Sequence, residues 1–581
     1  MIGLLIPLLF VSVGWFTHDP VNIFASAVLL IFSLGFLLIN GRLKLNRNPV
    51  TYLPFAMVAI YTVSSIANGL SPASAFMGGY QRNYGVATFL ALALVFAVGI
   101  IHYKDQAKIL NWVLPSTLVL AVLYGFLQWS KNDPLPWINP FAAVTLTLGN
   151  PNFSGAFFGL LTITTVYLSI FSKQRLIQLI ALFGSAGSIF LAPRTKSLQS
   201  VLLIGLSLVV FIFLLSLNQQ NKVFKALKYG SSTLFVGVVL FVGLMFSGSG
   251  NLLSGIRERF FFQGNVIQRL GYWQTGVDIW KENPILGVGP DQYQRYAAVY
   301  RSPQQLLRDG PFVIPDKAHN VLIDHFANGG IFAGAVWIAF VILVFVSLFN
   351  SLKTAENKTE RQHLAVLGSI WTTYVAQALI SPDQLVLSVI GYLAAGLIVG
   401  FNLKNVDTMR IDPFVIRSIA GFMLVLSLIV MGKALSVNGQ AKEVLQGRIT
   451  GNQAIMKVVQ SWPNAKTTEL IGIQEIAKPN NCQFTQEIAS ELLKYDNRSS
   501  QAWYMRAICE NNNRNFVGAL EDIQESLRFD PINTSYLIGK AKLEIAANVL
   551  IAAKETIEKI QKLDPKNLEI PALLSSVNLA D

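Results

Sequence analysis

Long apolar runs alternate with short polar and basic stretches over residues 1–435 of the chain. A run of about 20 apolar residues is long enough for an α-helix to cross the hydrocarbon layer of a bilayer. The pattern predicts thirteen spans, at residues 1–17, 21–40, 50–68, 84–101, 110–129, 152–171, 176–192, 198–217, 228–247, 327–350, 362–380, 384–402 and 414–432. The first is interpreted as a retained span, because it lacks the basic region and cleavage site of a signal peptide. The expected fold is an all-α, polytopic membrane helical bundle.

Composition agrees with this interpretation. The chain is 52% hydrophobic and 13% charged, whereas soluble domains carry about 25% charged residues. A net charge of +13 does not indicate nucleic-acid binding here, because the basic residues cluster in short loops between apolar runs, as cytoplasmic loops require. The two cysteines, Cys482 and Cys509, have no zinc-ligand spacing and form no disulfide framework, although one bridge between them is possible.

The basic loops also orient the spans. If the N-terminus is cytoplasmic, alternate loops on the inside carry Arg42, Lys44, Arg47, Lys104, Lys108, Lys173, Arg175, Lys222, Lys225, Lys228, Lys353, Lys358, Arg361, Lys404 and Arg410. Short outside loops have few cations, namely Arg82, Lys131, Arg194 and Lys196. This distribution follows the positive-inside rule. An odd number of spans then places the C-terminal part outside the cell membrane, together with the long loop 247–318.

A 34-residue repeat marks the C-terminal domain, predicted at residues 440–581. Small residues and a proline recur at this interval, as Ala507, Ala519 and Pro531 and then Ala541, Ala553 and Pro565. The spacing resembles the tetratricopeptide repeat, in which small residues lie where two helices touch. Two units are few for a stable stack, so a degenerate third unit is expected within 440–500. Such a stack binds a partner protein or caps the membrane domain, and the sequence leaves both roles open.

The predicted outer loop 247–318 is the best candidate for chemistry. It carries only two lysines, Lys281 and Lys317, but six arginines, namely Arg257, Arg259, Arg269, Arg295, Arg301 and Arg308. A predominance of arginine favours bidentate phosphate binding. A solvated loop with surface arginines is the simpler alternative.

One stretch of this loop carries a recognisable motif. RLGYWQTGVDIWKENPILGVGPDQYQRY, residues 269–296, is followed by HNVLIDHFANGGIFAGAVWIAF from His319. The Arg-x-x-x-Trp helix, the Pro-x-x-Gly-x-Gly turn and the His-Asn-x-x-Leu segment resemble the shared domain of O-antigen ligases, O-antigen polymerases and bacterial protein O-oligosaccharyltransferases, over roughly residues 150–345. GGYQRNYG around Arg82 and GNPNFSG from Gly149 resemble two upstream features of that family. The sequence departs from the family at Arg194, which follows Pro193 where the family often has serine.

The resemblance implies a metal-independent transferase without a cofactor, in the cytoplasmic membrane of a bacterium. The donor would be a glycan on polyprenyl diphosphate. The acceptor would be a hydroxyl of a lipid-linked core sugar, of another glycan or of a protein. Negative charge develops on the departing diphosphate and needs stabilisation. Arg82, Arg194 and Arg269 are the candidates, because each lies next to the outer end of a predicted span. Glycan ligation or protein O-glycosylation is the expected activity, with lipid-linked glycan polymerisation as the alternative.

A general base must take the acceptor proton, and histidine suits this role near neutral pH. Of the five histidines, His102 and His363 fall in predicted inside loops and His18 follows the first predicted span. His325 lies six residues after His319, so the two point in different directions on one helix. His319, at the mouth of a span, is the predicted base or acceptor-positioning residue. A helix-capping or interface role is the simpler alternative.

Three neighbouring residues are expected to support the site. Asn320 would cap a helix or form a hydrogen bond. Trp273 and Tyr293 would stack on sugar rings, although an interfacial aromatic belt explains them equally well. The turn between Pro284 and Gly289 is expected to be structural and to fold the loop back onto the membrane surface.

Three other functions are weighed against this prediction. A metal-dependent oligosaccharyltransferase places acidic residues in its first outer loop, where this chain has only Asp19, so no metal site is expected. A transporter or flippase of lipid-linked sugars would suit thirteen spans, but the inverted repeats of many such folds are not evident. A non-catalytic assembly factor would use the repeats to recruit partners, but it would not need a histidine and arginines at the mouth of a span.

Overall fold

The computed structural model describes residues 48–79, 82–134, 143–217, 222–223, 225–226, 229–230, 233, 265–404, 412–461, 471–472 and 481–580. Every regular element within these ranges is a helix. The predicted spans 1–17 and 21–40 lie outside the described residues, and so does nearly all of 228–247. The same is true of His18, Asp19, Arg42, Lys44, Arg47, Lys228, Arg257, Arg259 and Arg410.

Seven helices in the described ranges are long and apolar enough to cross a membrane, so the chain is a polytopic membrane protein. They are Tyr103–Trp129, which ends in α7 (Leu114–Trp129); α8 (Pro151–Phe171); Arg175–Thr195, formed by α9 (Arg175–Leu191) and the turn η4 (Ala192–Thr195); α10 (Leu198–Ser216); α16 (Val321–Thr354); α18 (Leu385–Asn402); and Pro413–Val430 of α19 (Pro413–Leu445).

Three further predicted spans coincide with helices that are shorter or more polar. The helices α3 (Leu53–Ala67) and α5 (Val86–Ile101) are apolar but have only 15 and 16 residues. The helix α17 (Lys358–Ala378) begins with the charged sequence KTERQH and is not among the seven apolar helices. Each of the ten predicted spans in the described ranges therefore overlaps a helix, while the total of thirteen stays a prediction.

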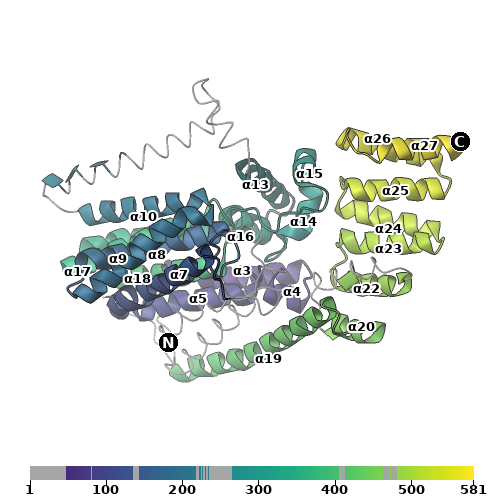
Figure 1. Cartoon of the computed structure of the whole chain (residues 1–581). Coiled ribbons are helices and arrows are strands. Elements are labelled where there is room, and N and C mark those ends of the chain that lie inside the picture. The colour runs from purple at the N-terminus through teal and green to yellow at the C-terminus, as the bar shows by residue number, and fades with distance from the viewer. Residues whose placement is uncertain are drawn as a thin grey trace.

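The helices α5 and α18 lie side by side in the bundle on the left of Figure 1, and α3, α8, α16 and α17 pack against one or the other of them. The contact between α5 and α18 is close because glycines meet there: a Cβ added to Gly99 would lie 2.9 Å from the Cα of Gly396. Aromatic side chains fill the neighbouring space, where the rings of Phe340 and Trp371 lie 5.6 Å apart. This close packing gives the helix ends that carry the candidate site a rigid support.

α16 begins at Val321, six residues before the predicted span, because Asn320 caps it and polar residues occupy its first turns. Its backbone is interrupted at Gly330, whose φ is +66°. A Cβ at Gly330 would lie 2.1 Å from the carbonyl oxygen of Ile285, so only glycine lets the 284–291 turn dock here. Backbone hydrogen bonds hold this contact, from Val288 N to Ala327 O (3.1 Å) and from Gly289 N to Asn328 O (2.8 Å). The turn therefore packs against the kink in α16.

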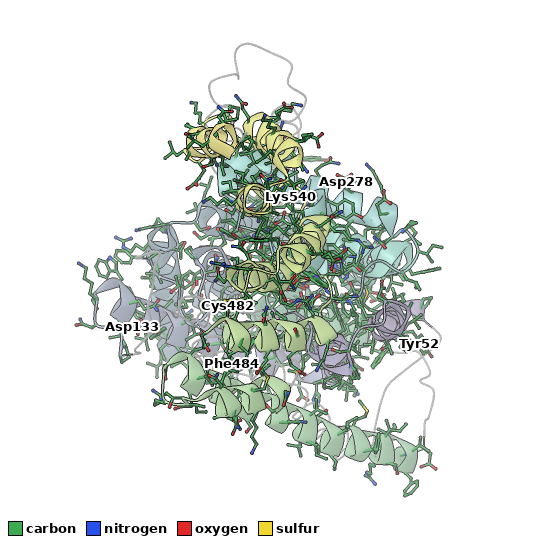
Figure 2. All side chains as sticks on the ribbon, turned by 90° about the vertical axis from the view of Figure 1, so that its right-hand side faces the viewer. Tyr52, Asp133, Asp278, Cys482, Phe484 and Lys540 are labelled. Atoms are coloured by element: carbon green, nitrogen blue, oxygen red, sulfur yellow. A yellow bond between two sulfur atoms is a disulfide. The ribbon has the colours of Figure 1, made fainter. Side chains whose placement is uncertain are left out.

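The C-terminal part is a stack of helices, seen on the right of Figure 1 and facing the viewer in Figure 2. It includes α20 (Asn452–Ser461), α22 (Cys482–Tyr495), α23 (Ser500–Asn512), α24 (Phe516–Phe529), α25 (Thr534–Ala546), α26 (Leu550–Leu563) and α27 (Ile570–Ala580). α23 and α24 pack as one pair and α25 and α26 as the next.

These helix pairs are consistent with the predicted repeats. The repeated alanines, Ala507, Ala519, Ala541 and Ala553, are all 0% exposed. α22 matches α24 and α26 in length and begins 34 residues before α24, at the position of an earlier unit. Cys482 at the start of α22 and Cys509 in α23 form a disulfide, the bridge that the sequence only allowed.

Candidate functional site

His319 lies directly before α16, at the end of a loop that contains α13 (Asn265–Glu282), α14 (Tyr293–Tyr300) and α15 (Pro303–Asp309). Its φ is +57°, in the left-handed region that residues other than glycine rarely adopt. Such backbone strain is concentrated at functional sites. Asn320 fixes the next position: its side chain accepts a hydrogen bond from Ile323 N (3.2 Å) and donates one to Leu379 O (2.8 Å). The cap of α16 therefore also ties this segment to the end of α17.

The imidazole of His319 is packed rather than free in solvent. Its ring centroid lies 5.2 Å from that of Tyr272, and the indole of Trp273 donates to the His319 carbonyl at 3.4 Å. Nδ1 is 3.1 Å from the carbonyl oxygen of Lys317. If Nδ1–H donates to this carbonyl, the lone pair of the neutral ring is on Nε2, which can accept a proton. Burial lowers the pKa of His319, so the ring is neutral near pH 7.

Arg82 and Asp316 form an ion pair beside this histidine. Nε of Arg82 lies 2.5 Å from the carboxylate of Asp316, and the guanidinium sits 5.3 Å from the ring centroid of Phe153. Burial raises the pKa of Asp316, but Arg82, with smaller contributions from His319 and Lys317, outweighs burial and holds the pKa below the usual value. Asp316 is therefore an anion, and it raises the pKa of His319, whereas Arg82 and Arg269 lower it.

Arg269 lies on α13 and, unlike Arg82, has no carboxylate partner among the described residues. Its half-buried position lowers its pKa, but a guanidinium keeps its charge throughout the physiological range. Among the residues that the structure describes, no carboxylate forms an ion pair with Arg269. Its guanidinium is thus not neutralised by a described carboxylate and is a candidate to bind an anion next to His319.

Arg194 contacts a different set of residues. It belongs to the turn η4, where its guanidinium is 3.4 Å from the ring centroid of Phe190 and 5.2 Å from that of Trp129. It also donates to the carbonyl of Phe190 at 2.6 Å. None of these contacts joins it to His319. The structure brings Arg82, Arg269 and His319 together, while a role for Arg194 stays a prediction.

The two predicted aromatic residues differ in exposure. Trp273 is half-buried beside His319, whereas Tyr293 is 0% exposed and donates its hydroxyl to Tyr272 O at 2.7 Å. Tyr293 thus supports the ring that packs on His319 and offers no free face to a sugar. His325 is separate again, since it is buried on α16 with Nδ1 2.7 Å from the hydroxyl of Tyr61.

The sequence did not point to Asp316 or Asp291, and it marked Lys317 only as one of two lysines in the long loop, without a role at the site. Lys317 is 2.5 Å from Asp291, and their side chains are 6% and 2% exposed. Among the acidic residues only Asp19 was weighed, as a possible metal ligand, and a pairing between positions far apart in the chain needs the fold to be seen. Their one sequence signal is position, because all three flank the turn and the histidine of the family-like motif.

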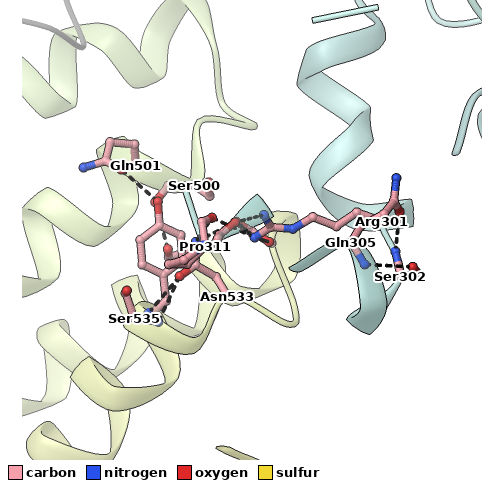
Figure 3. Close-up of polar contacts among 12 residues, drawn as sticks. Arg301, Ser302, Gln305, Pro311, Ser500, Gln501, Asn533 and Ser535 are labelled. Atoms are coloured by element: carbon pink, nitrogen blue, oxygen red, sulfur yellow. Dashed lines mark hydrogen bonds and ion pairs between the residues drawn. The ribbon is translucent and has the colours of Figure 1, made fainter. Parts of the chain in front are cut away.

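Two of the arginines in the long loop dock the repeat domain. Arg301 pairs with Asp530 at 2.8 Å, and Arg295 pairs with Asp496 at 2.5 Å. Figure 3 shows Arg301 reaching across to the repeat domain beside Asn533, which donates to Pro311 O at 3.0 Å. The predominance of arginine in the loop therefore serves domain docking as well as any anion site.

Comparison with known families agrees with this location. Residues 140–338 match the family model described as O-antigen ligase. The match includes Arg194, Arg269 and His319, and it ends inside α16, whereas Arg82 lies upstream of it. No curated protein matches the chain.

Proposed function

We propose that this chain, whose residues 140–338 form a domain of the O-antigen ligase family, transfers a glycan from a polyprenyl-diphosphate donor to a hydroxyl acceptor on the outer face of the membrane. Enzymes of this family transfer lipid-linked glycans. The observation that carries the proposal is the grouping of His319, Asp316, Arg82 and Arg269 at the mouth of α16. The group offers a neutral base next to two cations, which are the two functions that such a transfer needs.

His319 acts first on the acceptor. Nε2 takes the hydroxyl proton while the acceptor oxygen bonds to the anomeric carbon of the donor sugar. The bond from that carbon to the diphosphate oxygen breaks, and the electron pair leaves with the diphosphate. Arg269 and Arg82 stabilise the charge that develops on this leaving group, and Asp316 stabilises the imidazolium that forms.

Two features support an extracytoplasmic site. Disulfides persist in oxidising compartments, and the repeat domain contains the Cys482–Cys509 bridge. The repeat domain also contacts the loop of α14 and α15 through Arg295 and Arg301, so both lie on the same side of the membrane. With the basic loops on the other side, a cytoplasmic N-terminus is the expected orientation.

The acceptor separates the remaining activities. Purified protein in liposomes would be given a radiolabelled glycan on polyprenyl diphosphate with one acceptor at a time: a lipid-core oligosaccharide, a serine-containing protein, or a second donor molecule. Label on the core or the protein supports ligation or protein O-glycosylation, whereas lengthened donor glycan supports polymerisation. Movement of intact donor across the bilayer without a new glycosidic bond would instead indicate a transporter. The reaction is expected to proceed in chelator, with His319→Ala as the inactive control.

A further inference from the structure

Asp291 is a buried carboxylate that contacts two segments of the chain near His319. It follows the 284–289 turn, and its φ of +61° is in the left-handed region, which aspartate tolerates better than most residues. One carboxylate oxygen accepts hydrogen bonds from Gly79 N (2.7 Å) and Tyr84 N (3.0 Å). The other lies 2.5 Å from Nζ of Lys317. With 2% of its side chain exposed, the carboxylate is shared almost entirely among these donors.

These donors belong to the two segments that carry the proposed catalytic residues. Gly79 and Tyr84 flank Arg82 on either side. Lys317 comes two residues before His319, and its carbonyl oxygen is the atom 3.1 Å from Nδ1 of the histidine. A single carboxylate thus connects the arginine segment to the histidine segment, although these are more than 200 residues apart in the chain.

The surrounding backbone is shaped for this contact. A Cβ added to Gly78 would lie 2.8 Å from Asp291 Oδ2, and one added to Gly79 would lie 2.8 Å from the Asp291 carbonyl. The glycine pair of GGYQRNYG therefore lets the chain approach the carboxylate. Gln292 N donates to the side chain of Asn328 at 3.0 Å, which anchors the position of Asp291 on α16.

We propose that Asp291 is a positioning residue for glycan transfer. Its carboxylate binds both the Arg82 segment and the Lys317–His319 segment and so fixes their relative position. The proposal rests on the proposed function. The plainer alternative is a buried ion pair that stabilises the fold and has no influence on where His319 lies.

The charge of Lys317 allows an experiment to separate positioning of His319 from simple stabilisation of the fold. Asp291→Asn keeps a side-chain oxygen for Gly79 N and Tyr84 N. It removes the carboxylate that pairs directly with the buried ammonium of Lys317, which is strongly unfavourable although Asp324 and Asp316 still act on Lys317. Lys317 then moves toward water and takes its carbonyl away from Nδ1 of His319. Replacing the lysine as well, in Asp291→Asn/Lys317→Met, removes the buried charge that drives this movement.

The first measurement is the rate at which diethyl pyrocarbonate modifies His319, followed by mass spectrometry of the purified, folded protein. We expect Asp291→Asn to raise this rate several-fold and the double variant to restore it toward the wild-type value. Asp522→Asn, which breaks the ion pair to Arg506 within the repeat domain, is the control and leaves the rate unchanged. An unchanged rate in Asp291→Asn would overturn the proposal whatever the enzyme does.

The second measurement is transfer kinetics in liposomes. Misplacing a reacting group by about 1 Å costs on the order of 100-fold in rate, so kcat of Asp291→Asn should fall by about this factor, with a smaller change in the acceptor KM. The double variant should recover much of kcat. If kcat of the double variant is lower still than kcat of Asp291→Asn, positioning by Asp291 is contradicted. If His319 becomes more reactive in Asp291→Asn but His319→Ala transfers glycan normally, the proposed function fails while the connection by Asp291 stands.

Discussion

The guanidinium of Arg301 and the carboxylate of Asp530 form an ion pair at 2.8 Å in which the two side chains are only 2% and 0% exposed. Arg301 lies in the loop before His319, and Asp530 follows α24 of the repeat domain. The same guanidinium donates to Pro311 O at 2.9 Å, and so does the side chain of Asn533 at 3.0 Å. The repeat domain therefore holds the backbone five residues before Asp316 (Figure 3).

Arg301→Met is expected to loosen the repeat domain from the loop. The change leaves Asp530 buried without a cation, and breaking a buried pair in this way costs about 3–5 kcal/mol. Limited proteolysis and thermal unfolding of the purified protein would measure the effect. Arg528→Met is the matched control, because Arg528 is 70% exposed in its pair with Glu525, and such surface pairs contribute about 0–1 kcal/mol. Equal stability of the two variants would refute a docking role for Arg301.

The pH dependence of kcat/KM should follow His319. Burial lowers its pKa, so the acid limb of the profile should lie below the value of about 6.5 for a free histidine. Asp316→Asn removes an anion that raises this pKa. The acid limb should therefore move to still lower pH. The maximal rate is expected to change separately, since Asp316→Asn also removes the ion pair to Arg82. Asp278→Asn neutralises a carboxylate of α13 that pairs with Lys281 and is not among the groups that act on His319, so it should leave the limb in place; a shift to higher pH in Asp316→Asn would contradict the assignment.

The two hydrogen bonds of the Asn320 side chain should contribute separately to the stability of the fold. Asn320→Ala loses the cap of α16 and the bond to Leu379 O, and loss of a cap costs about 0.5–2 kcal/mol. Asn320→Asp keeps an oxygen for Ile323 N but cannot donate to Leu379. We expect a lower unfolding temperature for Asn320→Ala than for Asn320→Asp. If the two are equally stable, the capping bond contributes little.

The disulfide offers a test of orientation in intact cells. Cys482, which is partly exposed, should resist a membrane-impermeant maleimide until a reductant is added and should then be labelled, whereas Cys509 is 1% exposed and should react slowly in the folded domain. Cys509→Ser should leave the Cys482 thiol open to the reagent without reduction and lower the stability of the repeat domain, by about 2–5 kcal/mol for loss of a native bridge. Labelling only after the cells are opened would place the domain in the cytoplasm and contradict the proposed topology.

Much of the fold was predictable because its signals are local. Apolar runs gave the position of each described membrane helix, and the 34-residue interval gave the helix pairs, since buried alanines recur wherever two helices touch. The start of α16 was predicted wrongly, because Asp324, His325 and Asn328 make its first turns polar. These residues are buried against other helices, which hydropathy alone does not show.

The candidate site was predictable only where a motif marked it. His319 was proposed from elimination and family resemblance, and Arg82 and Arg269 from their places beside spans, and their roles stay predictions. Asp291 was not found, because its role depends on hydrogen bonds to Gly79 and Tyr84 from a distant segment. Arg301 was grouped with the phosphate-binding candidates, since a sequence does not show that its partner, Asp530, arrives from the repeat domain.

The most direct test compares wild type, His319→Ala and His102→Ala in cells lacking the endogenous protein, at equal membrane levels. Polyprenyl-diphosphate-linked glycan is quantified in lipid extracts, and its membrane side is found from its access to an added glycosidase. Our account predicts that wild type and His102→Ala consume this pool, while His319→Ala lets it accumulate on the outer face. If His319→Ala consumes the pool as wild type does, His319 is not the base and the proposed site is wrong.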